Sequence, residues 1–557
     1  MNKKYVQIAI FVILLFSGCK EGLDLFPKDT ISDGTFWKTA SDFKLAANNL
    51  YGSLEDFDTR DTQSDIAYSV PNSVSNGTYQ TSETAGEWNT PYIYIRRCNN
   101  ILKKVGESPI AGDVKQFAAE ARFFRAYNYW LLFRQYGGVP LITEVLDINS
   151  TTLYAPRASR QETVDLILKD LTDAAVDLPE QKSLPSGDIG RVTKGAANSL
   201  KARVALFEGT WGKFRNNVDA NGYLDIAIQA SQSVMSSSQY ALFNSKGNQS
   251  YRYLFIDEGD DSQECILDRR HQRDISGTEY TYIVGIGSLL PTKKLADMYL
   301  CADGLPITQS PLFEGYSANT SEYQNRDPRM TMTMLIPGAY APRTWYVDPV
   351  ASWPFYPQRN ANTGYTTYKF LTEDKYANEL QDDRCSFDFR LIRYAEVLLT
   401  YAEATFERNG SISDDDLNKS INIVRQRVNM PSLKNAFVSS NGLDMRGEIR
   451  RERTIELALE GYRYDDLRRW KTAEIELPQS IKGIKIVGSN WTDPVIIEGA
   501  NRNPYADASW QGKTDQNGFI VAESAAERSF DPNKHYLRPL PTKEILINPD
   551  LQQNPGW

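Results

Sequence analysis

The chain has 557 residues, of which 24% are charged, and a formal net charge of −9. This length is ample for a large hydrophobic core. An acidic balance without a basic run argues against nucleic acid as a partner, because that kind of binding rests on neutralising phosphates.

The first residues are typical of an export signal. Residues 1–4 include Lys3 and Lys4 and so form a positively charged start, and residues 6–16 are almost wholly apolar. That run is too short to span a bilayer, which takes about 20 residues, so we expect a signal peptide at 1–18. Two small residues then precede Cys19, as in bacterial lipoproteins, and we expect Cys19 to carry a lipid anchor. The alternative is an ordinary signal that happens to be followed by a cysteine.

Helical patterns dominate the rest of the chain. Residues 117–136, FAAEARFFRAYNYWLLFRQY, are apolar on two faces, so this helix should lie inside a stack of helices. A Gly-Gly-Val-Pro sequence then ends it. Further helices are predicted at 161–176, 194–207, 223–235, 389–408 and 414–428, and short strands at 264–267 and 484–487. Helix pairs of this size suggest tetratricopeptide-like units.

Two long polar stretches, 56–91 and 338–370, interrupt these patterns and are rich in aromatic residues. Between residues 340 and 368, eight of 29 residues are Phe, Trp or Tyr, against a chain average of 11%. Loops of this length are usually functional or disordered, and the aromatic content argues against disorder.

Aromatic rings in such loops are suited to binding carbohydrate, because the C–H face of a sugar packs against the electron-rich face of an indole or phenol. Polar side chains at the rim would then bind the hydroxyl groups. The alternative is that the rings only bury the loops against the helices. The expected ligand-binding residues are Asn72, Trp88, Tyr280, Tyr282, Trp345, Asp348 and Trp353.

The segment RERTIELALEGYRYDDLRRW is dense in charge. Arg453, Glu456, Glu460 and Arg463 recur at helical spacing, so we expect them to share one face and to form ion pairs that fasten the helix to its neighbours. The alternative is a pair of carboxylates for acid–base catalysis. Glutamates surrounded by arginines keep low pKa values and make poor general acids, which favours the structural interpretation.

No cofactor is expected. The acidic run 257–261 could offer oxygen ligands to Ca²⁺, but it lacks the spacing of an EF-hand loop, and a solvated acidic loop is the simpler interpretation. Cys98, Cys265, Cys301 and Cys385 are too far apart for a zinc knuckle, and their pairing cannot be read from the sequence. No catalytic nucleophile motif is present.

Several segments together resemble the SusD/RagB family of Bacteroidetes nutrient-binding lipoproteins. They include the start CKEGLDLFPKDTISDGTFWKTASDFKLAANNLYGSL, the helix AEARFFRAYNYWLLFRQYGGVPL, the block FRLIRYAEVLLTYAEA and the end YLRPLPTKEILINPDLQQNPGW. The matches run in order from Cys19 to Trp557. Lys20-Glu21 after the cysteine resembles the short acidic export signal of surface lipoproteins in that phylum.

The resemblance implies a mostly α-helical SusD-like fold, with tetratricopeptide-like helix pairs packed against an irregular, loop-rich part. Residues 19–240 would form an N-terminal region and 241–557 a C-terminal region of one compact unit. It further implies a non-enzymatic protein, lipid-anchored at the outer membrane and facing the cell surface. Such a protein would bind a glycan and deliver it to a SusC-like TonB-dependent transporter. A peptide or another non-sugar nutrient is the alternative ligand, and a glycoside hydrolase is a third interpretation.

Overall fold

The computed structural model describes residues 36–57, 60–216, 219–285, 287–337, 362–372, 385–494, 496–497, 499–501 and 503–557. Helices dominate these residues, and the strands form small two-stranded sheets. The expected mostly α-helical fold is confirmed. None of the described helices combines the length and the apolarity that a bilayer-spanning helix needs.

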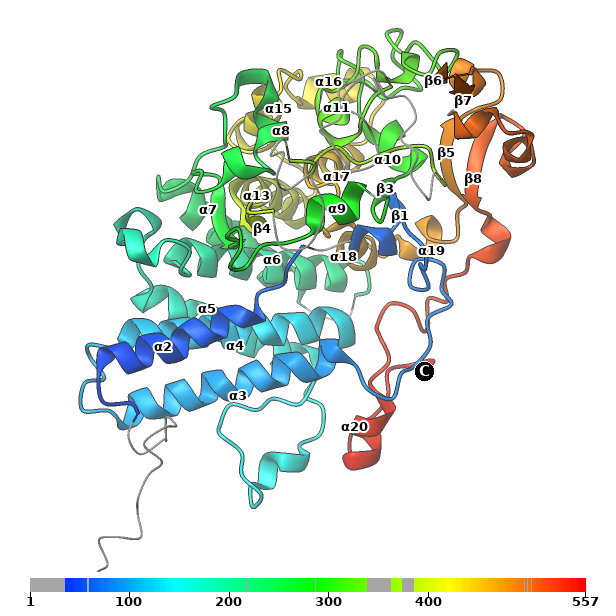
Figure 1. The fold of residues 1–557 in the computed structure, drawn as a ribbon. Helices are drawn as coiled ribbons and strands as arrows, with labels where there is room; N and C mark the ends of the chain where they lie inside the picture. The colour runs from blue at the N-terminus through cyan, green and yellow to red at the C-terminus, as the bar shows by residue number, and fades with distance from the viewer. Residues whose placement is uncertain are drawn as a thin grey trace, which may run out of the picture.

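The helices of the N-terminal half lie side by side in the lower part of the molecule (Figure 1). Neighbours in sequence from α3 to α7 pack against each other, and four of the helices predicted from periodicity are confirmed. The bounds are α2 (Ala40–Leu50), α3 (Gly86–Glu107), α4 (Lys115–Tyr136), α5 (Arg160–Asp177), α6 (Lys194–Lys213) and α7 (Ala220–Ser236).

The central helix of this stack is α4, which is buried on nearly every side, as its two apolar faces predict. Inside the stack, Arg125 of α4 donates two hydrogen bonds to Asp170 of α5, at 2.7 and 2.8 Å. The helix ends at Gly137, whose φ of 75° lies in the region that glycine tolerates best.

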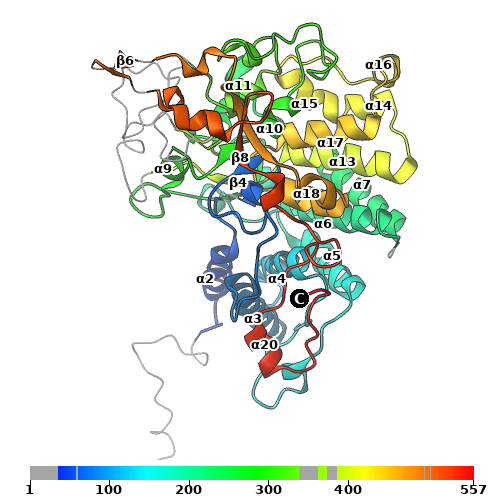
Figure 2. The same cartoon turned by 90° about the vertical axis from the view of Figure 1, so that its right-hand side faces the viewer.

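The C-terminal half lies above this stack, and α13 joins the two halves by packing against α6 and α7 (Figure 2). Its last helix, α20, returns to the lower part and lies near the start of α3 in both views. The bounds are α8 (Ser250–Tyr253), α9 (Tyr280–Gly285), α10 (Lys293–Met298), α11 (Arg329–Thr333), α13 (Tyr394–Asn409), α14 (Asp414–Asn418), α15 (Ile421–Arg427), α16 (Asn435–Ser440), α17 (Met445–Glu456), α18 (Arg463–Arg469), α19 (Ala473–Glu476) and α20 (Thr542–Ile547).

The described strands pair antiparallel as β1 with β3, β2 with β4, β5 with β8 and β6 with β7. The strands predicted at 264–267 and 484–487 correspond to β2 and β5, with shifted ends. The bounds are β1 (Ala67–Tyr68), β2 (Cys265–Arg269), β3 (Leu290–Pro291), β4 (Phe389–Arg393), β5 (Ile481–Lys485), β6 (Ile496–Ile497), β7 (Ala500–Asn501) and β8 (Phe519–Glu523).

Three local predictions are wrong. The helix expected at 389–408 starts only at Tyr394, because the five residues before it form β4 and pair with β2. The helix expected at 414–428 is divided into α14 and α15. The polar stretch expected to run to Pro91 ends at Gly86, since α3 begins there and continues through the proline.

The charged segment 451–470 does not form one continuous helix. Between α17 and α18 the chain turns through Leu459 and Gly461, whose φ angles of 66° and 85° are left-handed. The Gly461 N–H donates to Asp61 at 3.1 Å and so ties this turn to the N-terminal half. The prediction that the charges of the segment share one helix face is therefore wrong.

These charges nevertheless form the expected ion-pair network, because they pair with other elements. Glu456 accepts hydrogen bonds from Arg393 (2.7 Å) and Arg329 (2.9 Å) and also pairs with Arg427. Glu460 pairs with Arg393 at 2.7 Å. Burial raises the pKa of Glu456, but the three guanidiniums outweigh it and hold that pKa well below its usual range. A carboxylate held in this way fastens α17 to β4 and α15 and is unsuited to donating a proton.

Candidate functional site

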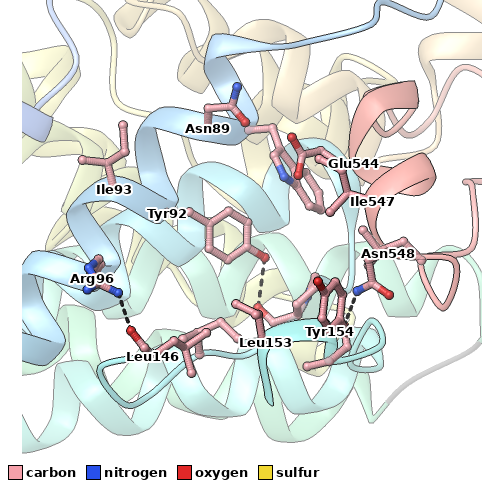
Figure 3. Close-up of a pocket in the computed structure, with 15 residues that line it drawn as sticks. Asn89, Tyr92, Ile93, Arg96, Leu146, Leu153, Tyr154, Glu544, Ile547 and Asn548 are labelled. Carbon is pink, nitrogen blue, oxygen red and sulfur yellow. Dashed lines mark hydrogen bonds between the residues drawn. The ribbon is translucent and has the colours of Figure 1, made fainter. Parts of the chain in front are cut away.

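A groove opens where three segments that are far apart in sequence meet: the first half of α3, residues 140–155 and α20. Its cavity measures about 450 Å³, within the range of ~300–1,000 Å³ that is usual for small-molecule sites (Figure 3). The lining is mainly apolar and aromatic, with a few polar groups at the rim.

The helical repeat of α3 places every fourth residue on the groove face, so Trp88, Tyr92 and Arg96 follow one another along it. The Tyr92 hydroxyl donates to the carbonyl of Pro140 at 2.9 Å, and Arg96 Nη1 donates to the carbonyl of Leu146 at 2.7 Å. These two bonds hold the 140–155 segment against the helix (Figure 3).

The third wall is attached in the same way. Asn548, directly after α20, donates from Nδ2 to the carbonyl of Ala155 at 3.0 Å. Apolar side chains from all three walls remain exposed at the opening, namely Ile93, Leu153 and Ile547. Such a contiguous apolar surface beside a cavity is typical of a binding site.

The aromatic rings of the groove differ in accessibility. Trp88 is only 3% exposed and packs edge-to-face on Tyr136, with ring centroids 5.1 Å apart, so it forms the floor. Tyr154, at the end of the 3₁₀ turn Thr151–Tyr154, is 54% exposed. Tyr92 is half-buried, so Tyr154 offers a ligand the largest accessible ring surface of the three.

Two polar side chains at the rim of the groove are available for hydrogen bonds to a ligand. Asn89 and Glu544 line the groove, and neither side chain makes a hydrogen bond within the part of the chain that the structure describes. An amide and a carboxylate together offer both donors and acceptors. The arrangement suits a ligand that has one flat apolar face and hydroxyl groups at its edge.

Among the predicted site residues, Trp88 is the one that lines this groove. Asn72 lies elsewhere and donates to Glu523 at 2.7 Å. Tyr280 is 2% exposed with its ring stacked on Phe57 at 4.0 Å, whereas Tyr282 is half-buried. Cys19, Trp345, Asp348 and Trp353 lie outside the described residues.

Sequence reasoning missed Tyr92, Tyr154, Asn89 and Glu544. The four-residue spacing of Trp88 and Tyr92 was a usable signal, but it requires that α3 be recognised through Pro91. No local sequence pattern indicates that Glu544 lies beside α3 in the folded chain, because that contact joins residues more than 450 positions apart.

In the described ranges, no group of three or more His, Cys, Asp or Glu side chains is placed to hold a metal ion. In the acidic run 257–261, Asp257 accepts from Thr372 at 2.8 Å, and Asp260 pairs with Arg390 at 2.8 Å. Only Glu258 and Asp261 are exposed, so the expectation of a solvated loop holds for part of the run.

All four cysteines in the described residues are buried and unpaired. Burial raises the pKa of the Cys98 and Cys265 thiols, which keeps them protonated and unreactive.

Two family models match the chain. One, described as SusD family, matches residues 229–557, which is more than half of the sequence. The other, described as starch-binding associating with outer membrane, matches residues 38–206. The division of the chain at residue 240 stays a prediction.

Individual proteins agree with these matches. A SusD-like protein of Formosa agariphila is 25% identical over 526 residues, which cover 86% of this chain and 95% of that protein. Two crystal structures from Bacteroides fragilis NCTC 9343 are each 26% identical with a TM-score of 0.74. The first, a SusD-like protein, covers 96% of this chain and 100% of its own. The second, a SusD-like carbohydrate binding protein, covers 93% of this chain and 100% of its own.

Proposed function

Because the chain belongs to the SusD/RagB family, we propose that it binds a glycan at the cell surface without cleaving it. The observation that carries this proposal is the exposed Tyr154 ring beside an apolar groove with Asn89 and Glu544 free at its rim. The carbohydrate-binding description of a relative that is 26% identical supports the same ligand class.

The geometry suits a sugar in two ways. The C–H face of a pyranose packs on the Tyr154 ring, and the apolar side chains beside that ring exclude water from the contact. The hydroxyl groups around the sugar edge reach Asn89 and Glu544, which supply the directional contacts that a flat apolar surface lacks.

Replacing Tyr154 with alanine should weaken glycan binding by about ten- to thirtyfold, because a central aromatic contact is worth roughly 1.5–2 kcal/mol when truncated. The melting temperature should stay unchanged, since the residue is 54% exposed. The ligand is first found by screening the wild type on glycan and peptide arrays, and affinities are then measured by titration calorimetry.

The control is Val176→Ala, which removes an exposed apolar group on α5 outside the groove and should leave binding intact. Tyr282→Ala tests the loop site expected from sequence. If it abolishes binding and Tyr154→Ala does not, the groove is not the glycan site. Preferential retention of peptides would support the non-sugar alternative, and release of product from a retained glycan would support a hydrolase.

We also propose that the protein is anchored through Cys19 and delivers its ligand to a TonB-dependent outer-membrane transporter. The lipoprotein pattern at 16–19 and the outer-membrane description of one family model support this proposal. A stable complex of this kind should bury more than ~2,000 Å².

Replacing Cys19 with alanine should remove the protein from the outer-membrane fraction, since the thiol that accepts the lipid is lost. Tagged wild-type protein, extracted in mild detergent, should retain a large β-barrel protein in near-equal amount. Protease accessibility on intact cells measures exposure at the surface. A C19A protein that stays anchored, or a wild type that is recovered alone, contradicts the anchor or the transporter proposal, respectively.

A further inference from the structure

The groove around Tyr154 is lined by two charged side chains, Arg96 and Glu544, and they lie at opposite ends of it (Figure 3). Arg96 comes from α3 and Glu544 from α20. The lining between them is mainly apolar and aromatic. The two ends of the groove therefore differ in the sign of the charge that they present to a ligand.

At the α20 end, the carboxylate of Glu544 has no cation beside it. The residue is half-buried, and it forms no ion pair within the part of the chain that the structure describes. Lys543 precedes it in sequence, but that side chain is exposed and likewise forms no ion pair with a described residue. A positively charged group of a ligand can thus approach Glu544 without displacing a partner.

The charge of Glu544 reaches the aromatic lining of the groove. Burial is the largest cause that raises the pKa of the Tyr92 phenol, and the negative charge of Glu544 adds to it, so the carboxylate lies close to this ring. Arg157 lowers the same pKa, but its guanidinium donates to the carbonyls of Tyr136 and Gly138, both at 2.8 Å. Arg157 is held by the backbone in this way and does not pair with Glu544.

The other end of the groove repels what Glu544 attracts. Arg96 is exposed, and its Nη1 donates to the carbonyl of Leu146 at 2.7 Å. No carboxylate of the described residues forms an ion pair with it. A positive group on a ligand would be repelled at this end and attracted at the α20 end, so the groove favours one position for it.

A protonated amine fits the α20 end. Its N–H groups would donate to the Glu544 carboxylate, and hydrogen bonds between oppositely charged groups are short and strong. The faces of the Tyr92 and Tyr154 rings attract the same cation. A hydroxyl group offers a similar geometry without the charge, and a carboxylate or a sulfate would be repelled by Glu544.

We propose that the groove recognises an amino sugar with a free, protonated amino group, and that Glu544 makes the charged contact to that group. This inference rests on the proposed function, because it names the class of glycan that the same groove takes. The sugar ring still packs on Tyr154. Arg96 sets the direction of the bound chain, with the amine toward α20.

Titration calorimetry with three disaccharides of the same linkage tests the proposal. The second sugar is glucose in each, and the first is glucosamine, N-acetylglucosamine or glucose. N-acetylation keeps the ring and removes the charge. At low salt the wild type should bind the glucosamine disaccharide about fivefold or more tighter than the other two. The preference should shrink at ~0.5 M NaCl, because salt screens a partly exposed charge pair.

Trialanine is the fourth ligand, because it carries an ammonium group without a sugar. Weaker binding of trialanine than of the glucosamine disaccharide supports the amino sugar. Tighter binding of trialanine overturns that identity and indicates a peptide amine as the group that Glu544 recognises.

Glu544→Gln should weaken binding of the glucosamine disaccharide by about three- to tenfold and change binding of the glucose disaccharide by less than about twofold. Its melting temperature should stay that of the wild type, since the Glu544 side chain has no described partner to lose. Glu544→Asp keeps the charge and should retain part of the preference. The matched control is Glu107→Gln, which removes an exposed carboxylate at the last residue of α3, outside the groove, and should have no effect.

Equal affinity of the wild type for the glucosamine and glucose disaccharides overturns the proposal, and so does an equal loss of both in Glu544→Gln. If that variant unfolds, the wild type decides, because a preference that is unchanged at high salt does not come from a charge pair. Failure of the proposed function is distinguishable. Tyr154→Ala should weaken all three disaccharides alike, and if it weakens none of them, the stacking site is wrong whatever Glu544→Gln does.

Discussion

Replacing Glu456 with glutamine should lower the free energy of unfolding by about 3–5 kcal/mol. The side chain is fully buried and lies between Arg329, Arg393 and Arg427. Glutamine keeps the shape but removes the negative charge, so three buried guanidiniums would be left with too few carboxylates. Urea unfolding followed by circular dichroism measures the change.

The matched control is an ion pair on the surface. Asp173 pairs with Lys169 at 2.5 Å on the exposed side of α5. Asp173→Asn should change the free energy of unfolding by less than about 0.5 kcal/mol, because water screens exposed pairs. Equal effects of the two substitutions would contradict a stabilising role for the buried network.

Buried carboxylates that pair with arginines, in this network and elsewhere in the fold, make stability depend on acid. A carboxyl whose pKa is lowered on folding stabilises the protein above its unfolded pKa, and the contribution is lost as the pH falls through the folded value. Burial opposes the shift at Glu403, yet Arg469 and its neighbours lower that pKa to about 2. Stability should therefore fall between about pH 4.5 and pH 2 in the wild type. The Glu456→Gln variant should show a shallower fall, because one of the titrating groups is missing.

Replacing Trp88 with alanine should destabilise the protein by about 3–5 kcal/mol, as is usual when a buried aromatic residue is truncated in a core. Trp88 packs between Tyr92 and Tyr136 under the groove, so the substitution leaves a cavity beneath the ligand site. Thermal unfolding measures the loss, and Trp88→Phe should recover part of it by filling most of the space.

Comparing Trp88→Ala with Tyr154→Ala distinguishes the role of the buried floor of the groove from that of its exposed surface. Tyr154→Ala should lower affinity at constant stability, whereas Trp88→Ala should lower stability first. A Trp88→Ala protein of normal stability that has lost glycan binding would show instead that the indole contacts the ligand directly, as the sequence alone suggested.

Local patterns predicted the scaffold well. The helices α4 to α7 follow from periodicity, because each buries a stripe that its own sequence defines. The residues of β4 were misjudged since Arg390 and Ile392 pair with β2, more than 120 residues earlier, and this pairing overrides the helical pattern that follows. No helix was predicted over α3, and the polar stretch was expected to run to Pro91, five residues beyond the start of this helix at Gly86.

The site was predicted less well, because it also depends on contacts between residues that are far apart in sequence. Trp88 was identified by its residue type, but its burial is decided by Tyr136 at the end of α4. Tyr154 lies in a short 3₁₀ turn without a periodic signal, and it lines a groove only because α20 lies opposite. The roles expected for Asn72, Tyr282 and the rings between 340 and 368 stay predictions.

The position of α20 links ligand binding to the integrity of the chain's end. This helix has six residues, and none of them is fully buried. Beside the groove contacts, it is held by backbone hydrogen bonds from Thr542 to Ser82 and from Lys543 to Glu83, both at 3.1 Å, and by Ile545, which packs against the core. A ligand that contacts both α3 and α20 would bind only the docked position of the helix, and by mass action it would stabilise that position. The nutrient would then act as a clamp that protects the C-terminal segment from fraying and from proteases for as long as it stays bound.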